Sequence, residues 1–381
     1  MKTILFIEFC PIGGSTKGLL TEIEYILNNC RNKYSPVVIG YPGSILGPHA
    51  EQYKYKFFEF EATGLEYLWG SPIRTMWLYF LAMYKIFIVA LKNRPDLIHC
   101  NHYMWSIYAN PIGFLFRIPV VIHLKDVWML EPKFSRLLMK FYSGAYYIAV
   151  SKYVKRLFVE KYKIDKKITI LIYDGINTSI APNITTEFLQ KKVDSHRKRI
   201  IMISRISVER DIEIFIDVAA LITRSYPGIS FHHYGFHPNH SDRTYLQLLK
   251  QRVNSLGMRG RMQFHNYEED PRKVAMLFQN SYLSLVTARQ FALPNVAIES
   301  LLCGTPVIAL DVGGNREVIR RDCLVKQNSP LLYADLIDLF LGNSNKYIKY
   351  GLSEIKFCKK RFDSDAQYKK VVDLYESVLR R

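Results

Sequence analysis

Short apolar segments alternate with longer segments of helical periodicity along most of the chain. A first series of apolar segments is expected to form strands at residues 3–7, 36–39, 97–100, 120–124, 147–150 and 168–172. A second series follows at residues 200–203, 230–234, 262–264, 282–286 and 306–309. Many of these segments are apolar throughout, as in strands that are covered on both faces of a parallel sheet. The alternation predicts a doubly wound α/β fold that is formed twice.

The boundary between the two series is expected in residues 178–198, the most polar and least periodic stretch. We therefore predict one domain over residues 1–180, a second over residues 181–355, and a C-terminal helix over residues 356–381 that packs back toward the first domain. Ligands of open α/β sheets bind at the carboxyl ends of the strands. Two such domains in tandem are expected to face a central cleft that holds the site.

Residues 75–91 form an almost wholly apolar segment. A membrane-spanning helix needs about 20 residues with few or no charges, and this segment is shorter and contains Lys85. We expect a helix of a soluble domain. A helix that also touches lipid and a true span are the alternatives.

The net charge of the chain indicates that it has an anionic partner. Among the 381 residues, Lys and Arg number 52 and Asp and Glu number 34, a net charge of +18. The excess is spread over both halves, which indicates a phosphate-bearing ligand, an acidic membrane surface or nucleic acid. Basic and acidic residues are interspersed and no nucleic-acid-binding motif is present, so we expect no nucleic acid partner.

The six cysteines are scattered, and none belongs to a CxxC pair. This pattern is typical of reduced thiols in a cytosolic protein and not of a disulfide frame or a zinc site. The first apolar segment is interrupted by Glu8 and is too short for a signal peptide. A cytoplasmic location is therefore expected.

Two arginines follow the strand expected at residues 200–203. Arg205 lies just past the end of this strand, and Arg210 is expected in the first turn of the next helix. Cations at a helix N-terminus oppose the helix dipole unless an anion is bound there. A leaving diphosphate gains negative charge as its bond breaks, and two cations would stabilise it.

A second group of candidate residues surrounds the strand at 306–309. Glu299 lies on a helix among apolar neighbours, and a carboxylate in a covered position favours hydroxyl donors such as those of a ribose. Gly313 and Gly314 follow the strand, and paired glycines there allow backbone N–H groups to approach a phosphate. Gly13 and Gly14 offer the same arrangement in the first domain.

Two further patterns resemble metal sites but have simpler explanations. The tripeptide DSD at 363–365 precedes a helical pattern and predicts a helix cap. His232 and His233 are neighbours on one expected strand and point to opposite faces, so they do not easily ligate one ion. We expect no metal and no cofactor.

Three motifs occur in order in the second half, RISVER, LPNVAIESLLCGTPVIA and DVGGNREVI. The first half contains PIGG, RPDLIH, IPVVIHLKD, AVSK and YDGIN. Together these motifs give the chain a resemblance to the family-4 glycosyltransferases with the GT-B fold. It implies two Rossmann-like domains, an N-terminal acceptor domain and a C-terminal donor domain. It also implies metal-independent transfer from a nucleotide sugar with retained configuration, to a glycan or lipid-linked acceptor.

The resemblance assigns roles to particular residues. Arg205 and Arg210 match the cations that hold the donor diphosphate, and Gly13 and Gly14 match a loop near the donor phosphates and the acceptor. Donor binding is further assigned to Glu299, which matches the ribose-binding glutamate, and to Asn295, Gln290, Gly313 and Gly314.

The chain departs from the family in two places. Where the E-x7-E motif has its first glutamate, which contacts the transferred sugar, this chain has Phe291, and Gln290 is the candidate substitute. Lys125 stands where many members have histidine, and His123 lies just before it. Either of these two is expected to meet the acceptor or the sugar; a histidine that only hydrogen-bonds backbone is the alternative.

Three functions remain open at this point. A retaining hexosyltransferase in surface polysaccharide biosynthesis, such as that of lipopolysaccharide or capsule, is the first. The alternatives are a catalytically impaired nucleotide-sugar-binding subunit, because the first glutamate is lost, and a GT-B sugar-nucleotide epimerase.

The first domain also predicts membrane docking. Residues 57–91 are apolar and rich in aromatic side chains, including Trp69, Trp77, Tyr79 and Phe80. Such side chains favour the membrane–water interface, and basic residues are attracted to an anionic leaflet. We expect a protein that docks on the inner face of the membrane.

Overall fold

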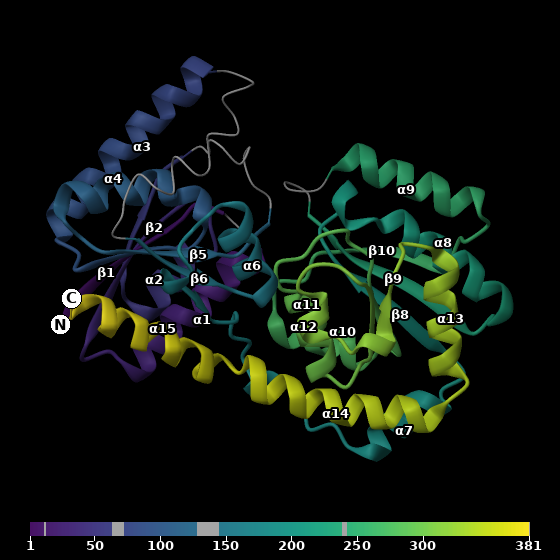
Figure 1. The fold of residues 1–381 in the computed structure, drawn as a ribbon. Helices are drawn as coiled ribbons and strands as arrows, with labels where there is room; N and C mark the ends of the chain where they lie inside the picture. The colour runs from purple at the N-terminus through teal and green to yellow at the C-terminus, as the bar shows by residue number, and fades with distance from the viewer. Residues whose placement is uncertain (11–12, 63–71, 128–144, 238–241, 381) are drawn as a thin grey trace. The chain divides into compact units, whose positions relative to one another are not determined.

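The computed structural model describes residues 1–10, 13–62, 72–127, 145–237 and 242–380. The chain divides into two compact units (Figure 1). Unit 1 comprises Met1–Gly175 with Ser364–Arg381, and unit 2 comprises Ile176–Asp363. The first boundary lies close to that expected at residue 180. The second follows Asp363 and not residue 355, so residues 356–363, expected in the C-terminal helix that packs on the first domain, belong to unit 2.

Unit 1 is built on a sheet of seven parallel strands in the order β3-β2-β1-β4-β5-β6-β7. Its strands are β1 (Lys2–Glu8), β2 (Tyr34–Gly40), β3 (Lys56–Glu59), β4 (Leu97–Cys100), β5 (Val120–Leu124), β6 (Ala145–Ala149) and β7 (Thr169–Leu171). Its helices are α1 (Gly14–Asn29), α2 (Leu46–Tyr53), α3 (Pro72–Asn93), α4 (Ser106–Phe116), α6 (Lys152–Lys161) and α15 (Ser364–Leu379).

The last helix of the chain completes the core of unit 1. In Figure 1, α15 (yellow) lies beside α1 (purple) under the sheet, and α3 and α4 lie on its other side. Val371 and Tyr375 of α15 are fully buried and pack in one cluster with Ile4 of β1 and Ile23 of α1. The residues at the two ends of the chain therefore share one hydrophobic core.

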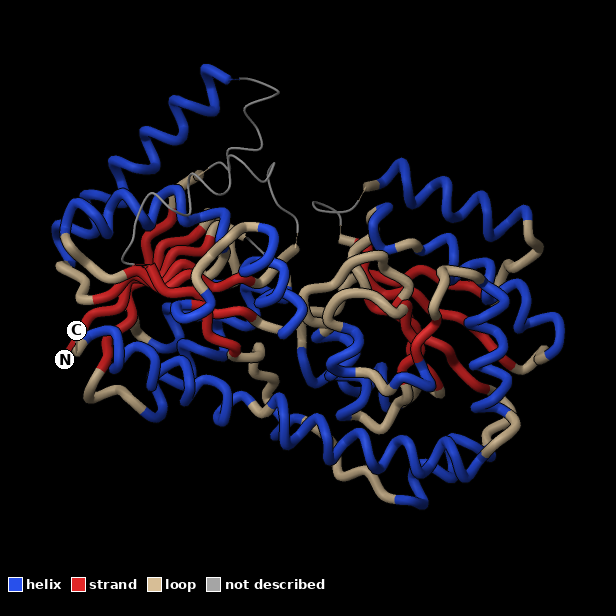
Figure 2. Tube along the Cα trace, viewed as in Figure 1, coloured by secondary structure: helices blue, strands red, loops and turns tan. Residues whose placement is uncertain are grey.

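Unit 2 is built on a parallel sheet in the order β10-β9-β8-β11-β12-β13, with helices around it (Figure 2). Its strands are β8 (Lys198–Ile203), β9 (Ile229–Phe236), β10 (Met262–Asn266), β11 (Leu283–Val286), β12 (Val307–Leu310) and β13 (Leu324–Val325). Its helices are α7 (Thr186–Asp194), α8 (Ile212–Ser225), α9 (Arg243–Ser255), α10 (Pro271–Gln279), α11 (Asn295–Leu302), α12 (Asn315–Val318), α13 (Pro330–Leu341) and α14 (Ser344–Phe362).

The two doubly wound sheets expected from the sequence are confirmed, and each expected strand overlaps an observed one. Two strands were missed, β3 and β13. Both lie at sheet edges; β3 is partly exposed and begins and ends with a charged residue, and β13 has two residues. Edge strands of this kind lack the apolar run that marks a strand covered on both faces.

Candidate functional site

The loop after β8 carries the two arginines. Arg205 is exposed, and its Nη2 lies 2.7 Å from Oε1 of Glu209. Arg210 was expected in the first turn of a helix, and this expectation is wrong. It ends a 3-10 turn, Val208–Arg210, and α8 begins only at Ile212. The two helical segments are separated by Asp211, whose left-handed backbone (φ 53°) interrupts α-helical geometry.

Arg210 is half-buried and lies against the residue that departs from the family pattern. Its guanidinium carbon is 4.8 Å from the centre of the Phe291 ring, in cation–π geometry. Oγ1 of Thr287, just past β11, donates a 2.8 Å hydrogen bond to the carbonyl of Arg210. The loops after β8 and β11 are thus held together.

Gly313 and Gly314, after β12, pack against the same segment. The Gly314 N–H donates a 3.0 Å hydrogen bond to the carbonyl of Phe291. A Cβ at Gly313 would lie 2.2 Å from the Phe291 carbonyl oxygen, and one at Gly314 would lie 2.1 Å from that of Ala292. Close packing of two backbones is therefore sufficient to require glycine at both positions.

The remaining candidates of unit 2 lie on the β11–α11 connection. Gln290 is exposed, Asn295 begins α11, and Glu299 is half-buried one turn later. The Asn295 Oδ1 atom is buried and accepts no hydrogen bond from the residues that the structure describes. Because β8, β11 and β12 are neighbours in a parallel sheet, these residues and the two arginines gather at one edge of unit 2.

A pocket of about 400 Å³ adjoins β9, β10 and α10. Its wall includes Tyr234 and His265, which are directly paired across the strands and stack with ring centres 4.3 Å apart. Tyr267, Glu268 and Lys273 add polar groups to the lining. Burial lowers the pKa of His265, so its ring is neutral at pH 7. This pocket has no signal in the sequence, because an aromatic stack across two strands depends on their pairing register.

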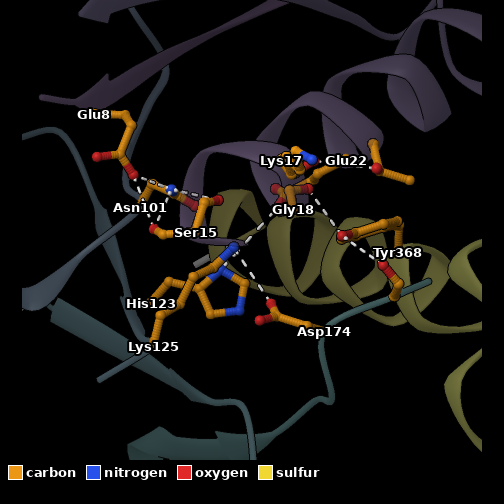
Figure 3. Close-up of polar contacts among 12 residues, drawn as sticks. Glu8, Ser15, Lys17, Gly18, Glu22, Asn101, His123, Lys125, Asp174 and Tyr368 are labelled. Carbon is orange, nitrogen blue, oxygen red and sulfur yellow. Dashed lines mark hydrogen bonds and ion pairs between the residues drawn. The ribbon is translucent and has the colours of Figure 1, made fainter. Parts of the chain in front are cut away.

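His123 and Lys125 of unit 1 lie near and just past the end of β5 (Figure 3). Their side chains are buried. The Lys125 ammonium is 3.3 Å from the Asp174 carboxylate and its side chain is 2% exposed. Gly18 of α1 leaves the space for this ammonium, since a Cβ there would lie 3.0 Å from Nζ. The His123 side chain is buried as well.

Glu22, His99 and Tyr375 extend this buried cluster. Glu22 Oε1 lies 3.0 Å from His99 Nδ1 and accepts a 2.6 Å hydrogen bond from the Tyr375 hydroxyl, which also contacts His99. Burial by itself raises the pKa of Glu22, but His99 and Lys125 lower it below its usual value. Burial, together with the charge of Lys125, holds the pKa of His123 well below its usual value.

The same cluster has the composition of a metal site. Ligand-type atoms of Glu22, His99 and His123 lie within 4.8 Å of one another. However, the Lys125 ammonium opposes a second cation there, and the Tyr375 hydroxyl occupies His99 Nδ1. We interpret the group as a buried ionic network that joins α15 to α1, β4 and β5.

Gly13 precedes α1 and Gly14 is its first residue, and the first two residues of their motif, 11 and 12, lie outside the described residues. Gly13 has φ 142°, a conformation that side chains disfavour. The buried carboxylate of Glu8 accepts hydrogen bonds from Ser15, Asn101 and other groups around this turn (Figure 3). It therefore fixes both ends of the turn.

Known proteins resemble both halves of the chain. Residues 183–353 match the family described as Glycosyl transferases group 1, and residues 45–180 match Glycosyltransferase Family 4. A D-inositol 3-phosphate glycosyltransferase of Xylanimonas cellulosilytica is 27% identical over 141 residues, 36% of this chain. That match spans 33% of the relative's own length.

Solved structures resemble the whole chain. HepE of Anabaena, in complex with UDP and glucose, is 19% identical, with a TM-score of 0.80 over 99% of this chain and 100% of that one. Sucrose-phosphate synthase of Thermosynechococcus elongatus is 17% identical, with a TM-score of 0.80 over 100% of both chains.

Two doubly wound parallel sheets of this kind, shared with these structures, define a protein of the GT-B fold. The two family matches together take in most of the chain. The chain therefore belongs to the family-4 glycosyltransferases and is a glycosyltransferase of GT-B type, as the motifs predicted.

Proposed function

We propose that this protein is a retaining glycosyltransferase that moves a hexose-type sugar from a nucleotide sugar to a glycan or lipid-linked acceptor in surface polysaccharide biosynthesis. The observation that carries the proposal is the edge of unit 2 where Arg205, Arg210 and Glu299 gather. A nucleotide-sugar donor is supported by the relative HepE, whose structures contain UDP, UDP-glucose, or UDP and glucose.

The chemistry of unit 2 fits a nucleoside diphosphate. The pocket lined by Tyr234 and His265 offers a neutral aromatic wall for a base, and Glu299 offers a carboxylate to ribose hydroxyls. Arg205 and Arg210 face the diphosphate, whose charge grows as the glycosidic bond breaks. Fixed cations stabilise that charge without a bound metal, so the proposed reaction is metal-independent.

Phe291 stands where related proteins have the glutamate that contacts the transferred sugar, so another side chain has to make that contact. An aromatic ring accepts no hydrogen bond from sugar hydroxyls in the way a carboxylate does. Gln290 is exposed beside it and offers an amide in its place. We therefore propose that Gln290, and not a carboxylate, contacts the sugar.

Product analysis with several nucleotide sugars and a lipid extract tests this function. The anomeric configuration of the product is read by NMR. Transfer with retained configuration supports the proposal. Donor that is only isomerised, or donor that binds without any turnover, would contradict it.

We propose further that the protein is cytoplasmic and docks reversibly on the inner face of the membrane through unit 1. One face of α3 exposes a row of large apolar side chains, Ile73, Met76, Trp77, Phe80, Tyr84 and Leu91. Phe114 and Leu115 of α4 are also exposed, and α4 packs on α3 through Phe116 and Phe87. Residues Ile73–Asn93 have the length and hydropathy of a membrane span. Of the 18-residue window that meets this criterion, 28% is buried.

The apolar row is flanked by charges that suit an anionic surface. Arg74, Lys92, Arg94 and Arg117 are all exposed. Tyr79, expected to contribute to this face, instead turns inward; its ring stacks on Tyr108. Trp69 lies outside the described residues. Lipid contact through an interfacial helix is therefore proposed, with the buried side of α3 still packed on unit 1.

Co-sedimentation with liposomes tests the docking. We expect binding to anionic vesicles that weakens with added salt and is lost in a Trp77→Ser/Phe80→Ser variant. Leu248→Ser, at an exposed leucine of α9 in unit 2, is the matched control and should bind like the unaltered protein. Equal lack of binding to anionic and neutral vesicles at low salt would contradict docking.

A further inference from the structure

We infer that Asp211 and Arg289 are positioning residues that hold the Arg210 guanidinium where the leaving diphosphate needs it. This inference rests on the proposed function, because Arg210 acts there on the donor diphosphate. Neither Asp211 nor Arg289 was singled out by the sequence motifs.

Asp211 joins three loops of unit 2. Its buried carboxylate accepts two hydrogen bonds from Arg289, one from Nε at 2.6 Å and one from Nη2 at 2.9 Å. It also accepts a hydrogen bond from Nδ2 of Asn328, which lies between β13 and α13. Asn328 in turn accepts a 3.2 Å hydrogen bond from the Tyr333 hydroxyl. The loops after β8, β11 and β13 therefore meet at one carboxylate.

The backbone of Asp211 gives an independent reason to look for a role. Its φ of 53° lies in the left-handed region, which glycine adopts without strain and most other residues avoid. Asp tolerates this region better than most other residues, and the contacts of its side chain hold the backbone there. The Asp211 carboxylate is only 6% exposed, so Arg289, itself 72% exposed, and Asn328 keep a buried charge hydrogen-bonded.

The contacts converge on the residue next to Asp211. Arg210 is bonded through its carbonyl to Thr287, and its guanidinium lies on Phe291. Arg289 lies between Thr287 and Phe291 in the chain. Its guanidinium is hydrogen-bonded to Asp211, the residue after Arg210. The Asp211–Arg289 pair thus closes a frame around Arg210 and fixes the direction of its side chain. A cation that stabilises a transition state has to be held in place before the charge develops.

The experiment is a double-mutant cycle with Asp211→Asn and Arg210→Ala. Asparagine tolerates the left-handed backbone and keeps the shape of the side chain but loses the charge. We expect Asp211→Asn to lower kcat about tenfold or more, with a much smaller change in the KM of the donor. In the Arg210→Ala background the same substitution should change kcat less than about twofold, because it acts through Arg210.

Two further variants complete the design. Arg289→Gln, at an exposed position, removes the pair from its other side and should reproduce the loss of kcat. Asp217→Asn is the matched control, since Asp217 makes a similar two-bond pair with Arg252 on the surface of unit 2. It should leave kcat unchanged. Losses from Asp211→Asn and Arg210→Ala that multiply independently would overturn the inference.

A crystal structure of the Asp211→Asn protein separates this inference from the proposed function. We expect the Arg210 guanidinium to leave the Phe291 ring. A guanidinium that stays on the ring would overturn the positioning role, whatever the activity. If the unaltered protein neither binds UDP, ADP or GDP nor turns over a nucleotide sugar, the proposed function fails, and the crystal structure still decides where Arg210 lies.

Discussion

The two units share one architecture but use the ends of their strands differently. In unit 2 the loops after β8, β11 and β12 bring Arg205, Arg210 and Glu299 to one edge of the sheet, where they are exposed or half-buried. In unit 1 the polar side chains of β4 and β5, His99 and His123, are fully buried.

The reason for this difference is the helix that covers each sheet. In unit 1, α15 lies against α1, and Tyr375 reaches into the cluster of Glu22 and His99. The Tyr375 hydroxyl bonds to Glu22 and His99 and so holds the last helix on unit 1. Both ring nitrogens of the buried His123 have no hydrogen-bond partner among the residues that the structure describes. The same position on a doubly wound sheet thus holds a buried polar cluster in unit 1 and the proposed donor site in unit 2.

The largest expected effect concerns the exposed edge of unit 2. Arg210→Ala removes a charge whose contribution grows toward the transition state, and we expect a loss of roughly 2–4 kcal/mol, on the order of a hundredfold or more in rate. Steady-state kinetics with a nucleotide sugar measure it. Arg252→Ala, at an exposed arginine of the same unit, is the control. Unaltered turnover by folded Arg210→Ala protein would remove the proposed role of this edge.

The buried cluster of unit 1 should affect stability and not binding. Tyr375→Phe deletes a hydroxyl that contacts Glu22 and His99, and leaving buried partners unsatisfied costs about 1–3 kcal/mol of unfolding free energy. Urea denaturation measures the loss, and the affinity of the folded protein for UDP should not change. Tyr84→Phe, at an exposed tyrosine, should have no effect on either. A changed UDP affinity with unchanged stability would reverse the roles assigned to the two units.

The pH dependence of the free energy of unfolding should reflect the lowered pKa of His123. Because the pKa of His123 in the folded state lies well below 6.5, the unfolded chain takes up a proton below pH 6.5 that the folded chain does not, and stability falls as the pH falls. The lowered pKa of Glu22 acts in the same direction below about pH 4.5. We expect His123→Gln to reduce the slope between pH 6.5 and 5 by up to about 1.4 kcal/mol per pH unit.

Urea denaturation across this pH range checks that slope. His196→Gln, at an exposed histidine of unit 2, is the control and should leave the slope unchanged. An identical slope in the His123→Gln protein would mean that this imidazole titrates alike in the folded and unfolded chains.

The smallest effect is expected from chelation. If the arginines of unit 2 stabilise the leaving diphosphate, turnover should survive EDTA unchanged. Activity that disappears with EDTA and returns with Mg²⁺ or Mn²⁺ would show that these cations do not suffice. The DSD segment gives little support to a metal, since Asp363 there accepts a 2.6 Å hydrogen bond from Thr178.

The sequence by itself determined the fold class, because all strands of the two sheets except the edge strands β3 and β13 are short apolar runs that are visible without their partners. It also singled out Arg205, Arg210 and Glu299 as candidates, since their motifs follow or precede recognisable strands. Strand-end residues of a parallel sheet are placed at one edge by topology alone. Local pattern was sufficient for these features.

Only the tertiary structure decided which polar residues are buried. His99 and Tyr375 meet across 276 residues of sequence, and no local pattern indicates that α15 would cover the strand-end histidines. The contact of Arg210 with Phe291, the stack of Tyr234 on His265 and the pairing of Asp211 with Arg289 likewise depend on how loops and strands pack. Periodicity records which face of a segment is apolar, but the identity of the side chain opposite is fixed only when distant segments come together.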